Sequence, residues 1–398
     1  MKKIILFTFC LLVLVSMISV VFASKPGKLL IWSDSKRIEV LDKIVDRFEK
    51  EYGVPIVLQE KAYDNLNKDF TVQAPSGEGP DIIIISHDPL GELISNGLLE
   101  AIDLGDKTND FYKVAIDAFK WGDKLYGLPY AIESIGLIYN KDIIPEPPKN
   151  WAAFEEIIRK TTNKKEGRYA FAMPQPDPYH TFPFMSACGG YVFGEKNGVL
   201  DPTDVGLNNS GAVYGLTKLK NLYQEGLIPY VDYNDMESLF VQGKVGMMIT
   251  GPWAFGKLEE TGINFGFAQI PTIEGNEPKP FVGVQGFMIS SFSENKMLAK
   301  AFLTEFIAQK DILLEFYKSD KRPLAYIPAA EEIKVDPIVA GLLKSASAGI
   351  PMPKIPEMTA VWSAWTDALE LILTQKQETK PALDDAVNRI SKKITENK

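Results

Sequence analysis

Apolar residues in the first third of the chain follow two different spacings. Three short apolar runs, residues 29–32, 54–58 and 81–85, have the length of strands, and the third is apolar on every side, as central parallel strands are. Two stretches with helical spacing lie between them. The first carries Ile38, Leu41, Ile44, Val45 and Phe48. Gly53 follows it, where a left-handed residue is favoured. This alternation predicts an α/β fold that opens as a doubly wound sheet.

Polar residues stand at the carboxyl ends of two of these strands. The first strand leads into Ser33 and Asp34, and the third leads into Ser86, His87 and Asp88. Neighbouring parallel strands open on the same edge of a sheet, and ligands of open α/β sheets bind at that edge. We therefore expect the two strand ends to share one crevice.

The rest of the chain predicts a second α/β unit. Residues 121–129 are typical of a hairpin that turns at Gly122-Asp123, and Asn150 is a suitable N-cap for a helix that begins at Trp151. Further extended segments are predicted at 130–140, 169–173, 247–250, 263–270 and 281–290, and the last two helices at 358–373 and 381–394. No long linker interrupts this pattern, so strands or short crossovers should join the units.

A chain of 398 residues exceeds what one hydrophobic core usually fills, so two lobes are expected. We assign residues 24–132 and 286–334 to an N-terminal lobe. Residues 133–285 and 335–398 form the C-terminal lobe in this assignment.

One tryptophan directly follows a predicted strand. The apolar run Met247–Thr250 ends at Gly251-Pro252, because proline has no N–H to donate and glycine adopts backbone shapes that other residues avoid. Trp253 comes next, at the carboxyl end of the strand. Two interpretations are open. A ring held on a strand end is a platform for the apolar face of a ligand, and it equally suits a plug for the core beneath the loop.

The first 23 residues have the pattern of a secretory signal peptide. Lys2 and Lys3 precede an uncharged run from Ile4 to Phe22, and a loose small-residue cleavage site ends at Ala23. An uncleaved membrane anchor is the alternative, since the run is nearly long enough to span a bilayer. We favour cleavage and a periplasmic location, because the export pattern is complete and no other such run occurs.

Composition narrows the classes of function. The net charge is −9, which argues against nucleic acid as a partner because there is no basic excess to displace phosphate counterions. Cys10 lies within the predicted signal peptide, which leaves Cys188 unable to form an internal disulfide. The only histidines are His87 and His180, and no zinc-type spacing occurs. We expect neither a metal site nor a cofactor.

Charged and aromatic residues fall together at strand ends and in loops. They are Lys36, Arg37, Asp88, Glu133, Asp177, Tyr179, Trp253 and Trp362. A sugar has apolar C–H faces that suit aromatic rings, and its hydroxyls bond well to carboxylates and cations. Each acid or base alone is more often a solvated surface residue. Their common position is what indicates a sugar site.

An enzyme would use the same carboxylates, because two acids that flank a glycosidic bond make a glycoside hydrolase. However, the sequence contains no G-x-S-x-G, H-E-x-x-H, Walker or G-x-G-x-x-G motif. His87 beside Asp88 is weak support for acid–base chemistry, since a histidine so placed is more often a structural hydrogen-bonding group. We predict no catalytic residue.

Several longer motifs follow one another along the chain after the predicted signal peptide. They are Lys28-Leu-Leu-Ile-Trp32, Gly79-Pro-Asp-Ile-Ile83 with His87-Asp88, Leu137-Ile-Tyr-Asn-Lys-Asp142, Gly189-Gly-Tyr191, Gly251-Pro-Trp-Ala254, Lys279-Pro-Phe-Val-Gly-Val284, and Ile355-Pro-Glu-Met358 with Trp362. In order and spacing they closely resemble the maltose/maltodextrin-binding proteins of bacterial ABC importers, within the family-1 extracellular solute-binding proteins.

The resemblance implies a type II periplasmic-binding-protein fold, in which each lobe is a mostly parallel sheet flanked by helices and crossing strands form the hinge. It also implies a sugar in the interlobe cleft, hinge closure on the sugar, and recognition of the closed form by membrane permease subunits. By position, it places acidic sugar contacts at Asp88, Glu133 and Asp177, ring contacts at Tyr179, Trp253 and Trp362, and the family's lysine at Lys36 or Arg37.

The chain departs from the family at several cleft positions. Ile85 and Phe182 stand where the family has tryptophan, Ser363 where it has tyrosine, and Pro89 and Thr366 where it has arginine. Part of the aromatic and guanidinium lining is therefore lost, which leaves the length of the ligand open. Trp365, one helical turn after Trp362, is a candidate to replace one ring, although a core role is the better interpretation.

We therefore expect an exported, monomeric receptor that captures maltose or a maltodextrin, an α-1,4-gluco-oligosaccharide, and delivers it to an ABC import permease. A receptor for another oligosaccharide or another small ligand is the alternative. A secreted glycoside hydrolase is the third hypothesis.

Overall fold

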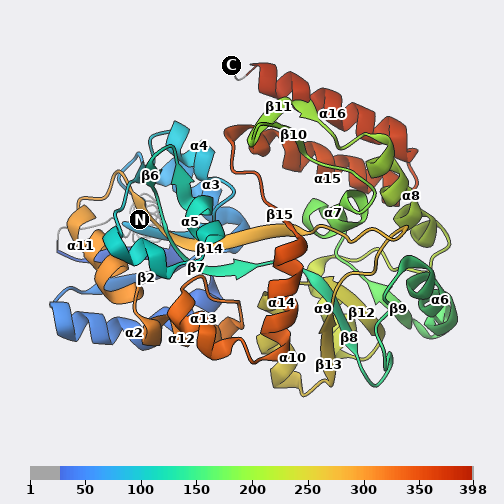
Figure 1. The fold of residues 1–398 in the computed structure, drawn as a ribbon, viewed down its shortest axis with the longest axis horizontal. Helices are drawn as coiled ribbons and strands as arrows, with labels where there is room; N and C mark the ends of the chain where they lie inside the picture. Colours follow the sequence, from blue (N-terminus) through green and yellow to red (C-terminus); the bar gives the residue numbers. More distant parts are fainter. Residues whose placement is uncertain (1–26, 397–398) are drawn as a thin grey trace, which may run out of the picture.

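The computed structural model describes residues 27–396, and Figure 1 shows two α/β lobes that lie side by side. The predicted α/β class and two-lobe architecture are confirmed. The predicted signal peptide, residues 1–23, lies outside the described residues.

The N-terminal lobe is built on a sheet with the main strand order β15-β14-β3-β1-β2, and β4 and β7 also pair with β14. Its strands are β1 (Leu29–Ser33), β2 (Ile56–Glu60), β3 (Ile82–Ser86), β4 (Leu99–Glu100), β7 (Leu128–Glu133), β14 (Phe281–Ser290) and β15 (Ile350–Pro351). β1 pairs in parallel with β2 and β3, whereas β14 runs antiparallel to β3, β4 and β7. The predicted β-α-β-α-β opening is present, and the returning strand makes the sheet mixed.

Helices cover this sheet, and the first of them, α2 (Ser35–Tyr52), contains the predicted helical stretch from Ile38 to Phe48. The others are α3 (Tyr63–Gln73), α4 (Leu90–Ser95), α5 (Lys113–Phe119), α11 (Lys296–Ala301), α12 (Lys310–Asp320) and α13 (Ile327–Ile333), with a π-helical segment at Phe302–Ile307. Helix α14 (Pro337–Ala348) packs against both lobes, with Val339 in the N-terminal core and Leu342 in a C-terminal core. The Asp34 carboxylate caps α2 by accepting from the Arg37 N–H, and Gly53 ends it in the left-handed conformation. The predicted hairpin is formed by β5 (Lys120–Trp121) and β6 (Lys124–Leu125).

The C-terminal lobe has a sheet of order β13-β8-β12-β9. Its strands are β8 (Gly136–Asn140), β9 (Tyr169–Ala172), β12 (Val245–Thr250) and β13 (Phe265–Ala268), and β10 (Phe193–Lys196) and β11 (Val199–Val205) form a separate hairpin. Only β9 and β12 are parallel in the larger sheet. Its helices are α6 (Trp151–Thr161), α7 (Pro178–Ser186), α8 (Ser210–Gln224), α9 (Tyr233–Val241), α10 (Phe255–Thr261), α15 (Thr359–Leu373) and α16 (Thr379–Glu396).

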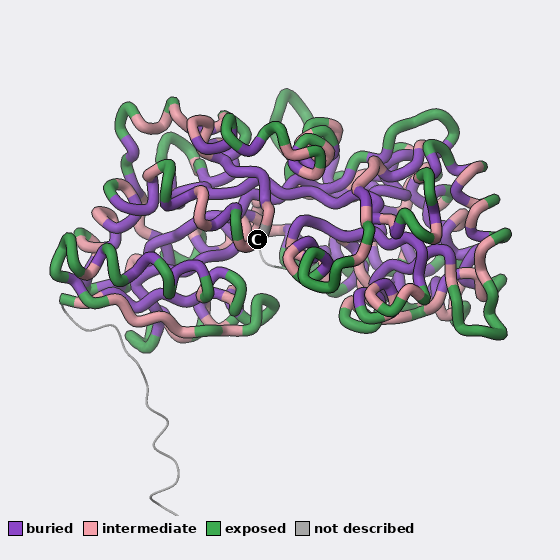
Figure 2. The backbone as a smooth tube through the Cα atoms, turned by 90° about the horizontal axis from the view of Figure 1, so that it is seen from below, coloured by how far each residue is buried: buried purple, intermediate pink, exposed green. Residues whose placement is uncertain are grey.

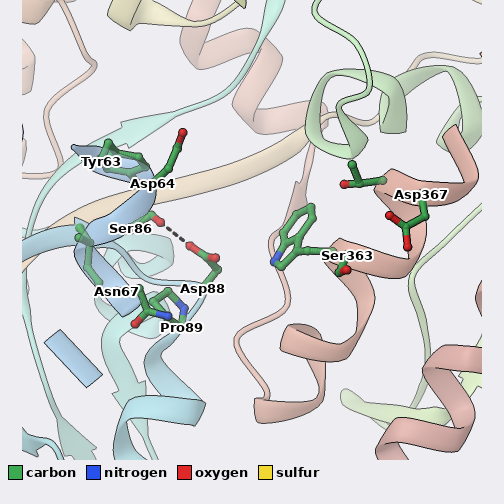
Figure 3. A pocket seen from close by; sticks show the side chains of 11 residues that line it. Tyr63, Asp64, Asn67, Ser86, Asp88, Pro89, Ser363 and Asp367 are labelled. Carbon is green, nitrogen blue, oxygen red and sulfur yellow. Dashed lines mark hydrogen bonds between the residues drawn. The ribbon is translucent and has the colours of Figure 1, made fainter. Parts of the chain in front are cut away.

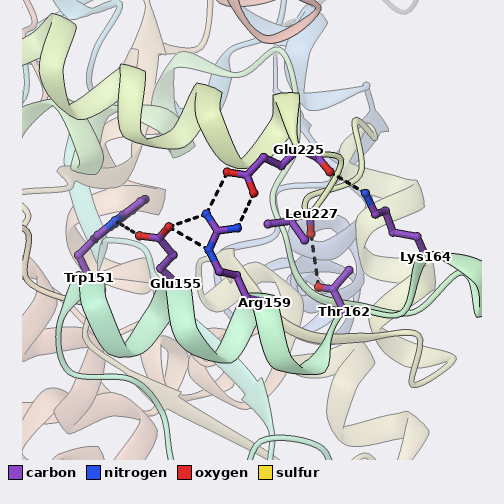
Figure 4. Close-up of polar contacts among 7 residues, drawn as sticks. All are labelled: Trp151, Glu155, Arg159, Thr162, Lys164, Glu225 and Leu227. Carbon is purple, nitrogen blue, oxygen red and sulfur yellow. Dashed lines mark hydrogen bonds and ion pairs between the residues drawn. The ribbon is translucent and has the colours of Figure 1, made fainter.

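Helix α6 is held by its cap and by polar contacts with the end of α8. The Asn150 side chain accepts from the Ala153 N–H, as predicted for an N-cap. Figure 4 shows Arg159 between Glu155 on its own helix and Glu225 just after α8, with an Arg159 Nη2 to Glu225 Oε1 distance of 2.9 Å. These charges are exposed, so they orient the two helices and contribute little to stability.

Buried residues form one core in the N-terminal lobe and one on each face of the C-terminal sheet. The N-terminal core contains residues from 29 to 132 and from 282 to 339, and the other two contain residues from 135 to 281 and from 342 to 394. The buried strands run through the interior of both lobes in Figure 2. We propose that the lobe boundaries lie where these cores change, which is within about seven residues of each boundary assigned from the sequence.

His87 bonds to both lobes where they join. The Val284 N–H donates to its Nδ1 over 3.1 Å, and its Nε2 lies 3.1 Å from the carbonyl oxygen of Met352, which belongs to the core of the other lobe. Because Nδ1 accepts, Nε2 carries the proton and donates. Burial, followed by the charge of Lys354, lowers the pKa of His87 to about 4. His87 is therefore a structural hydrogen-bonding group, which is the more frequent of the two roles considered for it.

We expect His87 to make the fold less stable as the pH falls from 7 towards 4. An unfolded histidine titrates near 6.5 and folded His87 near 4, so in this window only the unfolded chain binds the proton, and stability is lost as the pH falls. The lowered pKa of His87 accounts for about 3 kcal/mol of this loss in the free energy of unfolding. Urea unfolding at pH 7 and pH 4.5 should show a smaller loss for His87→Gln than for the parent protein. Equal losses would contradict the assignment.

Candidate ligand-binding site

A pocket of about 640 Å³ lies between the lobes. From the N-terminal lobe, the start of α3 and the end of β3 line it, and from the C-terminal lobe one face of α15 lines it. The lining residues are Tyr63, Asp64, Asn67, Ile85, Ser86, Asp88, Pro89, Trp362, Ser363, Thr366 and Asp367. Figure 3 shows the two walls facing each other. We call this space the interlobe pocket. The end of β3 opens into it, beside the end of its parallel neighbour β1.

Asp88 enters the interlobe pocket directly after β3. Its carboxylate accepts a hydrogen bond from the Ser86 hydroxyl (Figure 3). Burial raises the pKa of Asp88 to about 6, and the Ser86 hydrogen bond offsets only part of that shift. Asp88 is therefore ionised at neutral pH but is held in a setting that penalises its charge.

Glu133 forms the centre of a buried network beside the pocket. Its Oε2 accepts from Arg322 Nε over 2.6 Å, and its Oε1 accepts from Gln285 Nε2 over 2.7 Å. Burial raises the pKa of Glu133, but Arg322 and Gln285 outweigh it, and the net shift is downward. The Gln285 amide also donates to the Tyr63 hydroxyl over 3.1 Å, which connects this network to the pocket wall.

The two basic residues predicted after β1 occupy different positions. Arg37 is buried, pairs with Asp34, and donates from Nε to the Tyr130 hydroxyl over 2.6 Å. Its guanidinium lies 5.4 Å from the centre of the Tyr63 ring and supports the pocket wall from behind. Lys36 is exposed and reaches across to the C-terminal lobe, where it donates to the carbonyl oxygen of Trp253.

Four rings form a continuous aromatic wall on the C-terminal side: Tyr179, Trp253, Phe281 and Trp362. The Phe281 ring centre lies 5.9 Å from that of Tyr179 and 6.0 Å from that of Trp362, and the Tyr179 centre lies 6.2 Å from that of Trp253. The predicted Tyr179, Trp253 and Trp362 are partly buried, whereas Phe281, which links Tyr179 to Trp362, is fully buried. Of these four rings, Trp362 lines the interlobe pocket and the other three do not.

Asp177 and the Tyr179 hydroxyl add polar groups beside this wall. The Asp177 carboxylate caps α7 by accepting from the His180 N–H, and its Oδ2 lies 3.0 Å from His180 Nδ1. Burial raises the pKa of Asp177, yet His180 brings the net shift downward. The Tyr179 hydroxyl has no hydrogen-bond partner among residues 27–396, and burial followed by the Glu133 charge raises its pKa well above 10. This phenol therefore stays protonated.

The positions at which the sequence departs from the family include much of the pocket lining. Ile85, Pro89, Ser363 and Thr366 all line the interlobe pocket, and all are smaller than the residues expected there. Phe182 is buried instead and stacks on Phe281 with ring centres 4.1 Å apart. Trp365 is fully buried as well, so the core interpretation of this residue is confirmed.

Sequence reasoning missed several residues of the site. Tyr63, Asp64 and Asn67 belong to α3, which follows the carboxyl end of β2, so the strand-edge rule that identified Asp88 would also have found them. Gln285 is the only amide in the apolar strand β14, and a lone buried polar residue in such a strand is a usable signal. Arg322 lies in a loop and carries no comparable signal.

The arrangement combines hydrogen-bond acceptors with apolar ring faces. Within residues 27–396, no cluster of three or more histidine, cysteine, aspartate or glutamate side chains is suited to holding a metal ion. The helices within this range are each too short or too polar to span a bilayer.

Comparison with known proteins identifies the family. The family model of the bacterial extracellular solute-binding proteins matches residues 43–341. The chain is 33% identical to the galactooligosaccharide-binding protein of Bacillus subtilis (strain 168), over 92% of this chain and 89% of that protein. It is 31% identical to the maltotriose-binding protein of Pyrococcus abyssi, over 87% and 78%, and 30% identical to the maltodextrin-binding protein MdxE of Bacillus subtilis, over 94% and 92%. The chain therefore belongs to the bacterial extracellular solute-binding protein family.

Proposed function

We propose that this protein is an exported receptor that binds a maltodextrin between its lobes, closes on it by a hinge motion and delivers it to an ABC import permease. The observation that carries the proposal is the interlobe pocket itself. It brings a half-buried carboxylate, Asp88, opposite Trp362, which is part of a continuous aromatic wall. Sugars present apolar faces and hydroxyl donors together, and few other small solutes do.

Each predicted residue has a role in this proposal. The partly exposed rings of the aromatic wall, Tyr179, Trp253 and Trp362, pack against the C–H faces of the sugar rings. Asp88, Glu133 and Asp177 accept hydrogen bonds from hydroxyls, and Tyr179 donates its free hydroxyl proton. Lys36 already spans the lobes through the Trp253 carbonyl, so it supports the closed form. Arg37 acts through Tyr63 and not by direct contact.

Delivery without catalysis is the mechanism that we propose. The relatives reported above are named as binding proteins, and a receptor must release its sugar intact to the permease. Lobe closure needs flexible crossings, and the extended segment from β7 to β8 and the start of β14 connect the lobes. We propose a monomer in the periplasm.

A galacto-oligosaccharide is the second candidate ligand. The relative that is 33% identical carries that name, while those at 31% and 30% are named for maltotriose and maltodextrin. Both ligand types are neutral chains of hexoses, so a pocket of carboxylates and rings suits either. Discrimination between them depends on which hydroxyls point at Asp88 and Glu133.

Titration calorimetry of residues 24–398 tests the proposal. Maltose, maltotriose, maltotetraose and galactotriose should be titrated separately, and the mixture analysed afterwards for cleavage. Binding of one malto-oligosaccharide per protein molecule, with the sugar recovered intact, would support a maltodextrin receptor. Preference for galactotriose would select the second candidate. No heat with any of these sugars would overturn oligosaccharide binding, and cleaved sugar would overturn the receptor role.

Replacement of Gly251 by alanine should weaken oligosaccharide binding by about tenfold or more. An added Cβ at this position would lie 2.2 Å from the Trp253 ring, so the ring must move away from the aromatic wall. Calorimetry of Gly251→Ala, Trp253→Ala and the double variant measures this effect. The double variant should lose little more than Trp253→Ala, since both changes act on one ring. Additive losses would contradict this explanation.

A further inference from the structure

Asp88 differs from three other acids near the cleft. Asp34 pairs with Arg37, Glu133 with Arg322, and Asp177 lies beside His180. For Asp88, the described part of the chain supplies the Ser86 hydroxyl as a partner and no ion pair. Asp88 is half-buried, so its uncompensated charge carries a desolvation cost, and its partner is expected to come from the ligand.

The walls around Asp88 supply no cation either. None of the residues that line the interlobe pocket is basic, whereas Asp64, Asp88 and Asp367 all line it. Figure 3 shows Asp88 on one wall and Asp367 on the other, so a ligand between them faces a carboxylate on each side. Asp367 is half-exposed and pairs with Arg389 on α16, and Asp64 is exposed to solvent, which screens its charge. Asp88 is the least exposed of the three and is therefore the strongest source of uncompensated charge.

On the basis of the proposed function, we propose that the interlobe pocket selects sugar units by charge. It accepts a neutral unit, favours a unit that carries a protonated amine, and rejects a unit that carries a carboxylate. A protonated amine would give Asp88 the cation that the protein does not supply. A carboxylate would place a second negative charge beside Asp88 in a partly desolvated space, where repulsion is screened less than in water.

Matched ligands test this proposal. The parent is the neutral oligosaccharide that binds best in the titration above. Its terminal units are modified one at a time, to a carboxylate or to an amine, at C6 of the reducing-end unit or at C6 of the non-reducing-end unit. Modifying both ends ensures that whichever end enters the pocket is probed. At one end, the acid should bind about tenfold more weakly than the parent or worse, and the amine should bind at least as well as the parent.

Two variants make the result specific to the pocket. In Asp88→Asn the ratio between amine and acid affinities should shrink towards one, because the charge is removed while the shape is kept. In Asp385→Asn, which removes an exposed charge on α16, the ratio should stay as in the parent protein. Equal affinities for acid and amine at both ends, or a ratio that persists in Asp88→Asn, would overturn the charge selection. Failure of the neutral parent to bind would instead overturn the proposed function.

Discussion

Replacement of Arg322 by methionine should lower the free energy of unfolding by about 3 to 5 kcal/mol, the usual effect of removing one partner from a buried ion pair. Arg322 Nε lies 2.6 Å from Glu133 Oε2, and both side chains are less than a tenth exposed. Without Arg322, Glu133 keeps the Gln285 hydrogen bond but loses the cation that compensates its charge. Urea unfolding at pH 7 measures the loss.

The loss should become smaller at low pH. In the parent protein, Arg322 helps to hold the Glu133 pKa below 4.5, so this pair contributes stability above that pH and loses it as the pH falls. In Arg322→Met, burial raises the Glu133 pKa, so folded Glu133 takes up a proton before the unfolded chain does. The variant therefore gains on the parent protein as the pH falls from 7 to 5.

A double variant is the control for this prediction. Arg322→Met with Glu133→Gln removes both charges and should recover part of the stability that Arg322→Met loses. If the single variant were as stable as the parent protein, or if the double variant were no more stable than the single one, the Glu133 network would not stabilise the fold through charge pairing.

Replacement of Asp88 by asparagine should weaken sugar binding and strengthen the fold. Loss of a charged acceptor typically costs about 1.5 to 3 kcal/mol of binding, which is about tenfold to a hundredfold in Kd. At pH 8 the fold should gain about 2 to 3 kcal/mol, because the half-buried Asp88 carboxylate, with its pKa raised from 3.8 to about 6, is no longer present.

The pH dependence of this gain has a definite sign. Between pH 3.8 and 6, folded Asp88 is protonated while the unfolded chain is ionised, so the cost of Asp88 is present above pH 6 and disappears as the pH falls to 3.8. The free energies of unfolding of Asp88→Asn and of the parent protein should differ at pH 8, and this difference should nearly vanish at pH 4. Asp385→Asn is the matched control and should change neither stability nor binding. A less stable Asp88→Asn at pH 8 would contradict the prediction.

The neighbouring residues His87 and Asp88 therefore have opposite effects on how the stability of the fold depends on pH. His87 makes the fold less stable as the pH falls below 7, and Asp88 makes it more stable over nearly the same range. The pH profile of the parent protein should be flatter than either residue alone would produce. The two contributions are separated by comparing His87→Gln and Asp88→Asn, each with the parent protein.

Much of the fold could be predicted from local pattern. Apolar spacing located α2 and β14, glycine chemistry located the end of α2 at Gly53, and side-chain chemistry located the cap at Asn150. These features depend on neighbours within a few residues along the chain. The antiparallel return of β14 between β3 and β7 depends on distant pairing and was not apparent from periodicity.

The candidate site also has features that local sequence determines and features that depend on distant contacts. By itself, the sequence determined that Asp88 and Trp253 stand at strand ends, because strand length and strand termination are local properties. Only the tertiary structure decided which of the acidic side chains have a cation beside them. Arg322 reaches Glu133 from 189 residues away in the chain, while the fold brings no cation to Asp88 and places Trp362 across from it. Charge pairing depends on which distant side chains meet in space, and no periodic pattern encodes that.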